Sequence, residues 1–234
     1  MTRRRWIADE VSDGHAALLG EHADHLIRAL RARVGQEFDI ATGSAVRRGR
    51  ITSIRDGRVE FELGEELGVH SAAKVTLLLS IFKFDRMEWA IEKCTELGAT
   101  RIVPVIAQRT EVHLATAAAK RVERWQRIAR QASEQSRRVS VPEISPPAKV
   151  KDAIPSATGT CIVLSEQEQT SRLADLLPED PSTELTLAFG PEGGWTETEL
   201  TLFRHAGWMS ATLGNTILRA ETAIIAAVAV ALNK

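Results

Sequence analysis

Short, wholly apolar runs alternate with longer amphipathic segments from Val75 onward. Such runs are typical of strands buried on both faces of a parallel sheet, with helices between them. One helix is expected at 86–97, with Asp85 and Glu88 at capping spacing and Gly98 at its end, and another begins at the capping-box pair 196 and 199. The pattern predicts an α/β domain at 74–234. The expected strands are 75–79, 102–106, 161–164, 185–189 and 209–213, with a weaker candidate at 141–144.

Residues 1–68 follow a different pattern, with strands expected at 37–41, 50–54 and 58–63. Asp56 and Gly57 lie between the last two and suit a hairpin turn. A helix is expected at 22–33, ending near Gly35. We therefore predict a small β-rich domain, a compact barrel, joined to the α/β domain through the polar and glycine residues 64–68.

Composition excludes several classes of protein. No apolar stretch reaches the roughly 20 residues of a membrane span, and the basic start Arg3-Arg4-Arg5 is not followed by the apolar core of a signal peptide. Two cysteines, Cys94 and Cys161, are too few for a disulfide framework or a cysteine-based zinc site. His22 and His25 share a helical face without further ligands at metal-binding spacing. We expect a soluble, cytoplasmic protein with no metal and no membrane partner.

The last helical segment, residues 223–232, is apolar at all ten positions. A helix without a polar stripe must be buried on every side. In a small domain a second subunit most easily covers the outer face, so the segment predicts a homodimer. A deeply internal helix of a monomer is the alternative.

Two glycine-bearing turns, 189–194 and 213–218, follow the last two expected strands. Both should lie at the carboxyl edge of the sheet, where α/β folds bind ligands. Neither is a G-x-G-x-x-G sequence, and the chain has no P-loop sequence. Paired glycines let the backbone approach a ligand closely, which favours a nucleotide-like ligand over the alternative of two tight strand-to-helix turns.

Basic residues concentrate in 120–138, where seven stand against two acidic residues. Helical periodicity directs most of the basic side chains outward, where a row of them could follow phosphates. A polyanion partner and an ordinary solvated helix face both fit. The residues expected to face outward are Lys120, Arg124, Arg127, Arg130 and Arg138, and those expected to be buried are Val122, Trp125, Ile128, Ala129 and Ala132.

Five motifs follow one another along the chain. They are His22-Ala23-Asp24-His25-Leu26 with its continuation to Gly35, Met87-Glu88-Trp89 with its continuation to Pro104, Arg124-Trp125-Gln126-Arg127 with its continuation to Arg138, Gly190-Pro191-Glu192-Gly193-Gly194, and Leu213-Gly214 with Ile217-Leu218-Arg219 and Glu221-Thr222-Ala223. Together they resemble the RsmE family of ribosomal RNA methyltransferases. The resemblance implies a SPOUT-type parallel sheet with a C-terminal trefoil knot, and an N-terminal PUA-like β-barrel that contacts RNA.

The family resemblance also implies an activity. S-adenosylmethionine would be the cofactor, the enzyme a homodimer, and the target N3 of one uridine of 16S ribosomal RNA within the small ribosomal subunit. Nitrogen attack on the sulfonium methyl needs a base for the N3 proton or a cation near the uracil oxygens. Methylation at carbon C5 would instead need a thiolate, and neither Cys94 on a helical apolar stripe nor Cys161 at the start of an apolar strand looks exposed.

The resemblance assigns three groups of site residues. The catalytic candidates are Arg138, Glu134 and Arg219. Two of them have a structural alternative: Glu134 could form an ion pair with the arginines of 120–138, and Arg219 could pair with Glu221. Glu192 is a candidate base or a helix cap. Cofactor contacts are expected, mainly through the main chain, from Leu164, Ser165, Phe189, Gly190, Pro191, Glu192, Gly193, Gly194, Leu213, Gly214, Asn215, Ile217 and Leu218. RNA contacts are expected from Arg4, Arg5, His25, Arg28, Arg31, Arg124 and Arg127.

The chain departs from the family pattern at Arg137, Asn215, Thr216 and Ala220, and keeps every glycine of the cofactor loops. Two other functions stay open. One is a noncatalytic ribosome-assembly factor that binds RNA, and the other is a SPOUT enzyme that acts on transfer RNA or on a ribose oxygen.

Overall fold

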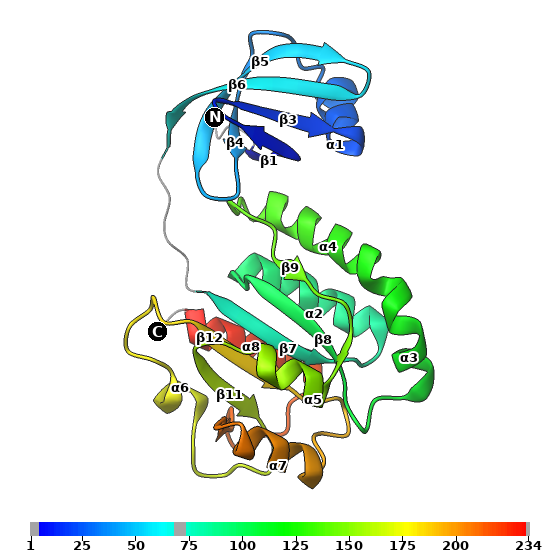
Figure 1. The fold of residues 1–234 in the computed structure, drawn as a ribbon, viewed down its shortest axis with the longest axis vertical. Helices are drawn as coiled ribbons and strands as arrows, with labels where there is room; N and C mark the ends of the chain where they lie inside the picture. The colour runs from blue at the N-terminus through cyan, green and yellow to red at the C-terminus, as the bar shows by residue number, and fades with distance from the viewer. Residues whose placement is uncertain (1–4, 68–73, 233–234) are drawn as a thin grey trace. The chain divides into compact units, whose positions relative to one another are not determined.

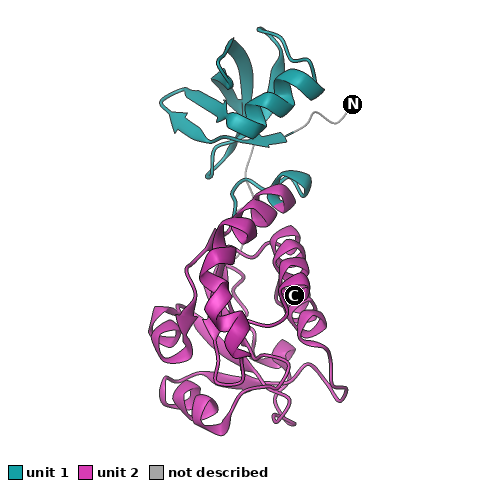
Figure 2. Ribbon diagram, turned by 90° about the vertical axis from the view of Figure 1, so that its right-hand side faces the viewer, with its two compact units in different colours: residues 1–70, 133–141 teal, residues 71–132, 142–234 magenta. Residues whose placement is uncertain are grey.

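The computed structural model describes residues 5–67 and 74–232. The chain divides into two compact units, residues 1–70 with 133–141 (unit 1) and residues 71–132 with 142–234 (unit 2) (Figure 2). The segment 133–141 groups with unit 1 by its contacts, although it lies within the range that the sequence assigns to the α/β domain.

Unit 2 is built on a seven-stranded parallel sheet of order β10-β8-β7-β12-β11-β13, with β9 beside β8 (Figure 1). Its strands are β7 Val75–Ser80, β8 Arg101–Ile106, β9 Glu143–Ile144, β10 Ala148–Lys149, β11 Thr160–Leu164, β12 Leu185–Phe189 and β13 Met209–Ala211. Its helices are α2 Phe84–Leu97, α3 Val112–Ala117, the 3-10 turn η2 Ala118–Arg121, α4 Val122–Gln135, α5 Val150–Ala153, η3 Ile154–Ser156, α6 Leu173–Leu176, α7 Glu197–His205 and α8 Ala220–Leu232. The last turn of α4, residues 133–135, groups with unit 1.

Burial explains why the strands of unit 2 are visible in the sequence. Leu77, Ile102, Ile162 and Leu187 are completely buried within their strands, and so is Ala188, which follows Leu187 and points to the opposite face of the sheet. Because both faces are covered, the strands are continuous apolar runs. The expectation of a parallel α/β sheet is confirmed, and β12 has the expected bounds.

Two helix starts test the capping predictions. The capping box at the start of α7 is present, because Thr196 accepts from the Glu199 amide and the Glu199 carboxylate accepts from the Thr196 amide. The capping prediction for α2 is wrong: its N-cap is Lys83, which makes no side-chain cap. Glu88 is bonded instead to the Arg124 guanidinium, at 2.7 and 2.8 Å. Local spacing had suggested a cap where a tertiary ion pair forms.

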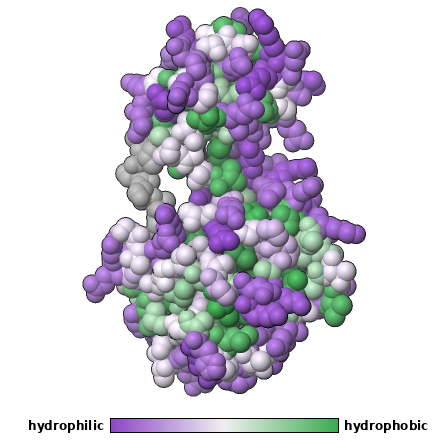
Figure 3. Space-filling view, in the orientation of Figure 1, coloured by the Kyte–Doolittle hydropathy of each residue, from purple (hydrophilic) through white to green (hydrophobic). Residues whose placement is uncertain are grey.

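Unit 1 contains a six-stranded sheet of order β1-β4-β5-β6-β3-β2, in which β1 pairs in parallel with β4 and the other pairs are antiparallel. Hydrophilic side chains dominate its visible surface in Figure 3, while Leu18, Leu26, Ile40 and Phe61 are completely buried. Its elements are β1 Arg5–Ile7, β2 Glu10–Ser12, β3 His15–Leu19, α1 Gly20–Asp24, the π-helical turn η1 His25–Ala29, β4 Glu37–Ala41, β5 Val46–Arg55 and β6 Arg58–Glu66.

The turns of unit 1 explain where the predictions hold and where they differ. Asp56 and Gly57 have φ of 48° and 69° and join β5 to β6, as expected of a hairpin turn. The helical segment covers 20–29 rather than the expected 22–33. Arg31 has a left-handed φ of 52°, which is incompatible with continuing the helix.

Candidate functional site

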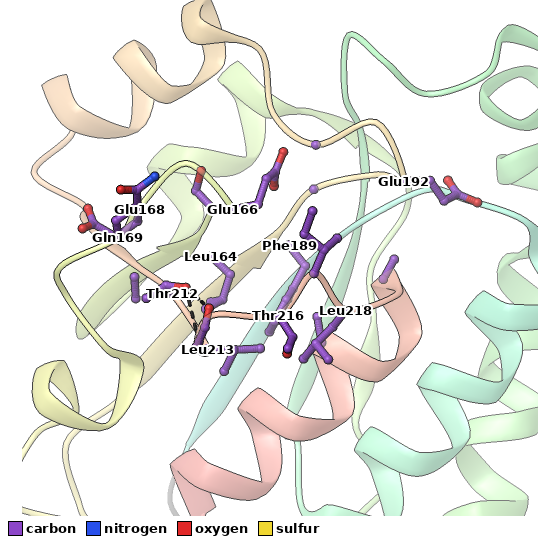
Figure 4. A pocket seen from close by; sticks show the side chains of 18 of the residues that line it. Leu164, Glu166, Glu168, Gln169, Phe189, Glu192, Thr212, Leu213, Thr216 and Leu218 are labelled. Carbon is purple, nitrogen blue, oxygen red and sulfur yellow. Dashed lines mark hydrogen bonds between the residues drawn. The ribbon is translucent and has the colours of Figure 1, made fainter.

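A pocket of about 670 Å³ lies where β11, β12 and β13 end (Figure 4). Leu164, Phe189 and Ala211 are the last residues of these strands, and all three line it. Its size is typical of small-molecule sites, and its position is where parallel sheets bind ligands. The complete lining is Leu164, Ser165, Glu166, Glu168, Gln169, Phe189, Gly190, Pro191, Glu192, Gly193, Gly194, Ala211, Thr212, Leu213, Gly214, Asn215, Thr216, Ile217, Leu218, Ala220 and Ala223.

The first loop, residues 190–195, is folded tightly against the end of β11. The Gly194 amide donates to the Pro191 carbonyl at 2.8 Å, and the buried Trp195 indole donates to the Leu164 carbonyl at 3.1 Å. Gly194 has φ of +67°, and a Cβ built there would lie 2.1 Å from Oε1 of Glu166. The backbone conformation therefore favours glycine at this position, and any larger residue would also have to displace the Glu166 carboxylate.

The second loop, residues 212–218, is fixed at its start and open at its end. The Thr212 backbone donates to Ser171 at 2.9 Å and accepts from Leu173 at 3.0 Å, so this loop is bound to the segment that follows β11. The Thr212 hydroxyl also caps Gly214, with a 3.1 Å bond to its carbonyl. Ile217 is 92% exposed, which leaves an apolar side chain at the pocket rim without a covering residue in the described chain.

The segment after β11 supplies two of the three carboxylates that line the pocket, Glu166 and Glu168. The Glu168 carboxylate accepts bonds from the Thr170 hydroxyl and the amides of Thr170 and Ser171, which lower its pKa to about 2. Glu166 and Glu192 are the other two carboxylates of the lining, and none of the described lining residues is lysine or arginine. The pocket therefore favours a ligand that carries positive charge.

Every residue that the sequence assigned to the cofactor lies in this lining. Polar lining residues that were not predicted from the sequence include Glu166, Glu168, Gln169 and Thr212. Glu166 directly follows Ser165, so its place just beyond a parallel strand was a usable signal. Glu168 lies farther beyond the strand and bonds locally to Thr170 and Ser171, whereas the role of Thr212 depends on hydrogen bonds to the distant residues Ser171 and Leu173.

Arg219 lies between two lining residues, Leu218 and Ala220, and is exposed. Glu221 is only 8% exposed in the first turn of α8, and the ion pair found for it in the described chain is with Arg86 of α2, at 3.7 Å. The alternative ion pair between Arg219 and Glu221 is therefore not formed in the structure.

Glu134 and Arg138 belong to unit 1 by their contacts. Glu134 lies 3.3 Å from Nε2 of His22, whose Nδ1 lies 3.4 Å from Asp9, so the neighbour found for its carboxylate is a histidine of unit 1 rather than one of the arginines named in the ion-pair alternative. The expectation that Arg138 faces outward holds only in part, since its side chain is half-buried and this burial lowers the pKa of its guanidinium. Helix α4 ends at Gln135 and Arg137 has φ of 58°, so helical periodicity does not extend to residue 138.

The RNA-contact candidates are placed differently from one another. His25 is exposed and its ring centroid lies 5.7 Å from that of Trp6, while Arg28 has 80% of its side chain exposed. The Arg5 guanidinium donates to the Arg137 carbonyl within unit 1. The remaining candidates divide into three groups: Arg31 and Arg127 are exposed, Arg124 is exposed but bonded to Glu88, and Arg4 lies outside the described residues. Along η2 and α4, Trp125, Ala129 and Ala132 are buried and Lys120, Arg124 and Arg127 are exposed, as expected. Val122, Ile128 and Arg130 are half-buried, so the expected division into a buried and an outward face holds only in part.

Residues 5–67 and 74–232 contain neither a metal-binding cluster nor a membrane-spanning helix. Within them, no three His, Cys, Asp or Glu side chains are grouped so that they could hold a metal ion. None of the helices in those ranges combines the length and apolar character needed to cross a bilayer.

Comparison with known proteins places this architecture in the class of RNA methyltransferases, because a family profile described as an RNA methyltransferase domain matches residues 70–232. The chain is 30% identical over 226 residues to ribosomal RNA small subunit methyltransferase E of Synechocystis, covering 94% of this chain and 74% of that protein. The protein of the same name from Bacillus subtilis is 30% identical over 220 residues, with 88% and 85% covered. This chain belongs to the ribosomal RNA small subunit methyltransferase E family, as its ordered motifs indicated.

A solved structure shows the same similarity in three dimensions. The ribosomal RNA small subunit methyltransferase E of Neisseria gonorrhoeae, solved bound to S-adenosyl methionine, has a TM-score of 0.81 and 33% identity to this chain. The match covers 97% of this chain and 96% of that one, so it includes both units.

Proposed function

We propose that this protein transfers the methyl group of S-adenosylmethionine to N3 of a uridine of 16S ribosomal RNA. The observation that carries the proposal is the acidic pocket enclosed by two glycine-bearing loops at the carboxyl edge of the sheet. Membership of a family named for methylation of the small-subunit ribosomal RNA supports the choice of substrate.

The residues of the pocket fit this cofactor. Gly190 and Gly194 keep side chains out of the space beside the loop, since a Cβ on Gly190 would lie 3.2 Å from the Trp195 amide nitrogen. Leu164 and Phe189 offer apolar surface for the adenosine, and the lining carboxylates complement the positive charge of the cofactor. When bound, the cofactor supplies a methyl group made electrophilic by the sulfonium sulfur.

The transfer balances as a single displacement. A bond forms between uracil N3 and the methyl carbon, the bond from that carbon to sulfur breaks, and S-adenosylhomocysteine leaves while the N3 proton passes to a base or to water. Arg219 is exposed beside the second loop, where its charge can stabilise the uracil oxygens as N3 loses its proton. Arg138 and Glu134 remain proposed catalytic candidates on the family resemblance. Glu192 is not a helix cap, because Thr196 caps α7, and it remains a candidate base.

The same proposal includes RNA contacts by each unit taken separately. The exposed basic side chains are His25, Arg28 and Arg31 in unit 1, and Arg127 of α4 in unit 2. Arg5 in unit 1 and Arg124 in unit 2 are added by resemblance, although each already donates to a protein oxygen, which reduces the charge it can offer to phosphate. Unit 1 would then be a PUA-like barrel that guides the enzyme to the small ribosomal subunit in the cytoplasm.

We also propose the SPOUT-type trefoil knot and a homodimer. Support for the knot comes from β13, which pairs with β11. Thr212, the residue after β13, also bonds to Ser171 and Leu173 in the segment that follows β11. Both pocket loops line the same cavity. Support for the homodimer comes from α8, whose Ile224, Ala227 and Val228 are completely buried while Val230 is 40% exposed. An apolar helix with an open face fits burial by a second copy.

The activity is tested with purified protein, labelled S-adenosylmethionine and three acceptors: isolated small subunits, naked 16S ribosomal RNA and transfer RNA. Nucleoside mass spectrometry should find 3-methyluridine in the RNA of the small subunits. Label in transfer RNA, or on a ribose oxygen, would refute the proposed substrate. Cofactor binding without transfer to any of these acceptors would favour the noncatalytic assembly factor.

A further inference from the structure

The turn that follows β8, residues 107–110, bonds to the first pocket loop from outside the pocket. Nη1 of Arg109 donates to the Gly193 carbonyl and, at 3.4 Å, to the Trp195 carbonyl. Arg109 itself is not part of the lining, whereas Gly193 is. The arginine therefore contacts the loop without lining the pocket.

The Arg109 side chain also supports the loop by packing. A Cβ on Gly193 would lie 3.3 Å from Cδ of Arg109 and 3.6 Å from its Cβ, so the aliphatic stem runs against the Gly193 α-carbon. Two carbonyl bonds and this contact act on a stretch with two consecutive glycines, Gly193 and Gly194, which has large conformational freedom when unrestrained.

The turn that carries Arg109 is itself fixed. The main-chain amide of Gln108 donates to Oε1 of the buried Glu199 at 2.8 Å. Oε2 of the same carboxylate accepts from the main-chain amide of Thr196 at 2.9 Å. The Thr110 hydroxyl accepts from the Ala107 amide at 3.1 Å. The turn is thus joined to the start of α7 at one point and to the loop at another, which gives Arg109 a rigid base.

We infer that Arg109 is a positioning residue for the cofactor: it holds the 190–195 loop in its binding conformation before the ligand arrives. Without the guanidinium, ligand binding would have to order the two glycines, and the entropy of ordering weakens affinity. This inference rests on the proposed function, because it assumes that S-adenosylmethionine occupies the pocket.

The test compares Arg109→Ala and Arg109→Lys with a matched control, Arg204→Ala. Arg204 is an exposed arginine of α7 that pairs with Glu197 rather than with the loop. We expect Arg109→Ala to raise the Kd and the KM for S-adenosylmethionine about tenfold, with kcat at saturating cofactor nearly unchanged. Arg109→Lys, which retains one donor, should fall between, and Arg204→Ala should bind as the wild type does. Thermal unfolding confirms that each variant is folded.

A second measurement does not depend on the cofactor. Amide hydrogen exchange of residues 190–195, followed by mass spectrometry in the free protein, should be faster in Arg109→Ala and unchanged in Arg204→Ala. If the wild type fails to bind S-adenosylmethionine while exchange still rises in Arg109→Ala, the proposed function is wrong and the positioning role stands. Wild-type affinity and exchange in folded Arg109→Ala, or the same losses in Arg204→Ala, would overturn the inference. If Arg109→Ala does not fold, wild-type affinity and exchange in Arg109→Lys would overturn it.

Discussion

Gly194 has a left-handed backbone conformation and lines the proposed cofactor pocket, so its substitution is a sharp test. An alanine there must adopt φ of +67° and place its Cβ 2.1 Å from Oε1 of Glu166. The backbone alone costs about 1–2 kcal/mol, and the Glu166 carboxylate must also move within the pocket. We expect Gly194→Ala to lower the affinity for S-adenosylmethionine at least about tenfold by calorimetry.

Gly207 is the matched control for Gly194. It has φ of +79°, a Cβ added there would meet nothing within 4 Å, and it lies outside the pocket lining. Gly207→Ala should therefore lose a similar amount of stability in thermal unfolding while it binds the cofactor normally. Equal cofactor affinity in the two variants would show that the pocket is misassigned.

The two cysteines decide between nitrogen and carbon chemistry. Burial raises the pKa of the completely buried Cys94 thiol and also that of the partly buried Cys161 thiol. A raised pKa keeps a thiol protonated as pH rises through 7 and 8, so neither side chain supplies the thiolate that methylation at C5 requires. We expect the Cys94→Ala Cys161→Ala variant to retain kcat within about twofold in the methyl-transfer assay. A folded double variant without activity would contradict direct transfer to nitrogen.

Helix α7 shows how a local sequence signal contributes to the site. Its capping box satisfies amides at the helix start, and the Thr196 hydroxyl also lies 3.1 Å from Oε1 of Gln108 in the turn that carries Arg109. Thr196→Ala removes the cap, which costs about 1 kcal/mol and should lower Tm by about 2–4 °C. Thr198→Ala, at an exposed position inside the same helix, should leave Tm unchanged or raise it slightly. Equal Tm values for the two variants would mean that the box does not stabilise the helix.

Elements whose signal is local were predictable, and those that depend on distant contacts were not. The strand β12 and the capping box of α7 follow from apolar runs and residue spacing. The strands β1, β2 and β3 were not predicted, because β1 and β2 have only three residues each and β3 consists of His15 followed by alanines and leucines, which are not typical of strands. The pocket glycines were found through their motifs, whereas Arg109 was missed because its bonds to Gly193 and Trp195 span more than 80 positions of sequence.

At the scale of the whole molecule, the apolar helix α8 is only partly covered by the rest of the described chain. The sequence predicted burial on every side, but within one chain Val230 is 40% exposed, and Trp89 of the neighbouring α2 is 47% exposed. Leu218, at the pocket rim before α8, is 37% exposed. A second copy packed on α8 would bury its exposed valine, as the proposed homodimer requires.

The proposed dimer predicts a specific response to charge on α8. In Val230→Glu, burying a carboxylate in an apolar interface without a partner costs several kcal/mol, enough to shift a dimer toward monomer at micromolar concentration. Light scattering coupled to size exclusion should report the mass of two chains for the wild type and of one chain for this variant. Val112→Glu, at a valine of α3 that is 82% exposed, is the control and should remain a dimer. A wild-type protein that elutes as a single chain, or a Val230→Glu variant that stays paired, would mean that α8 is not the dimer contact.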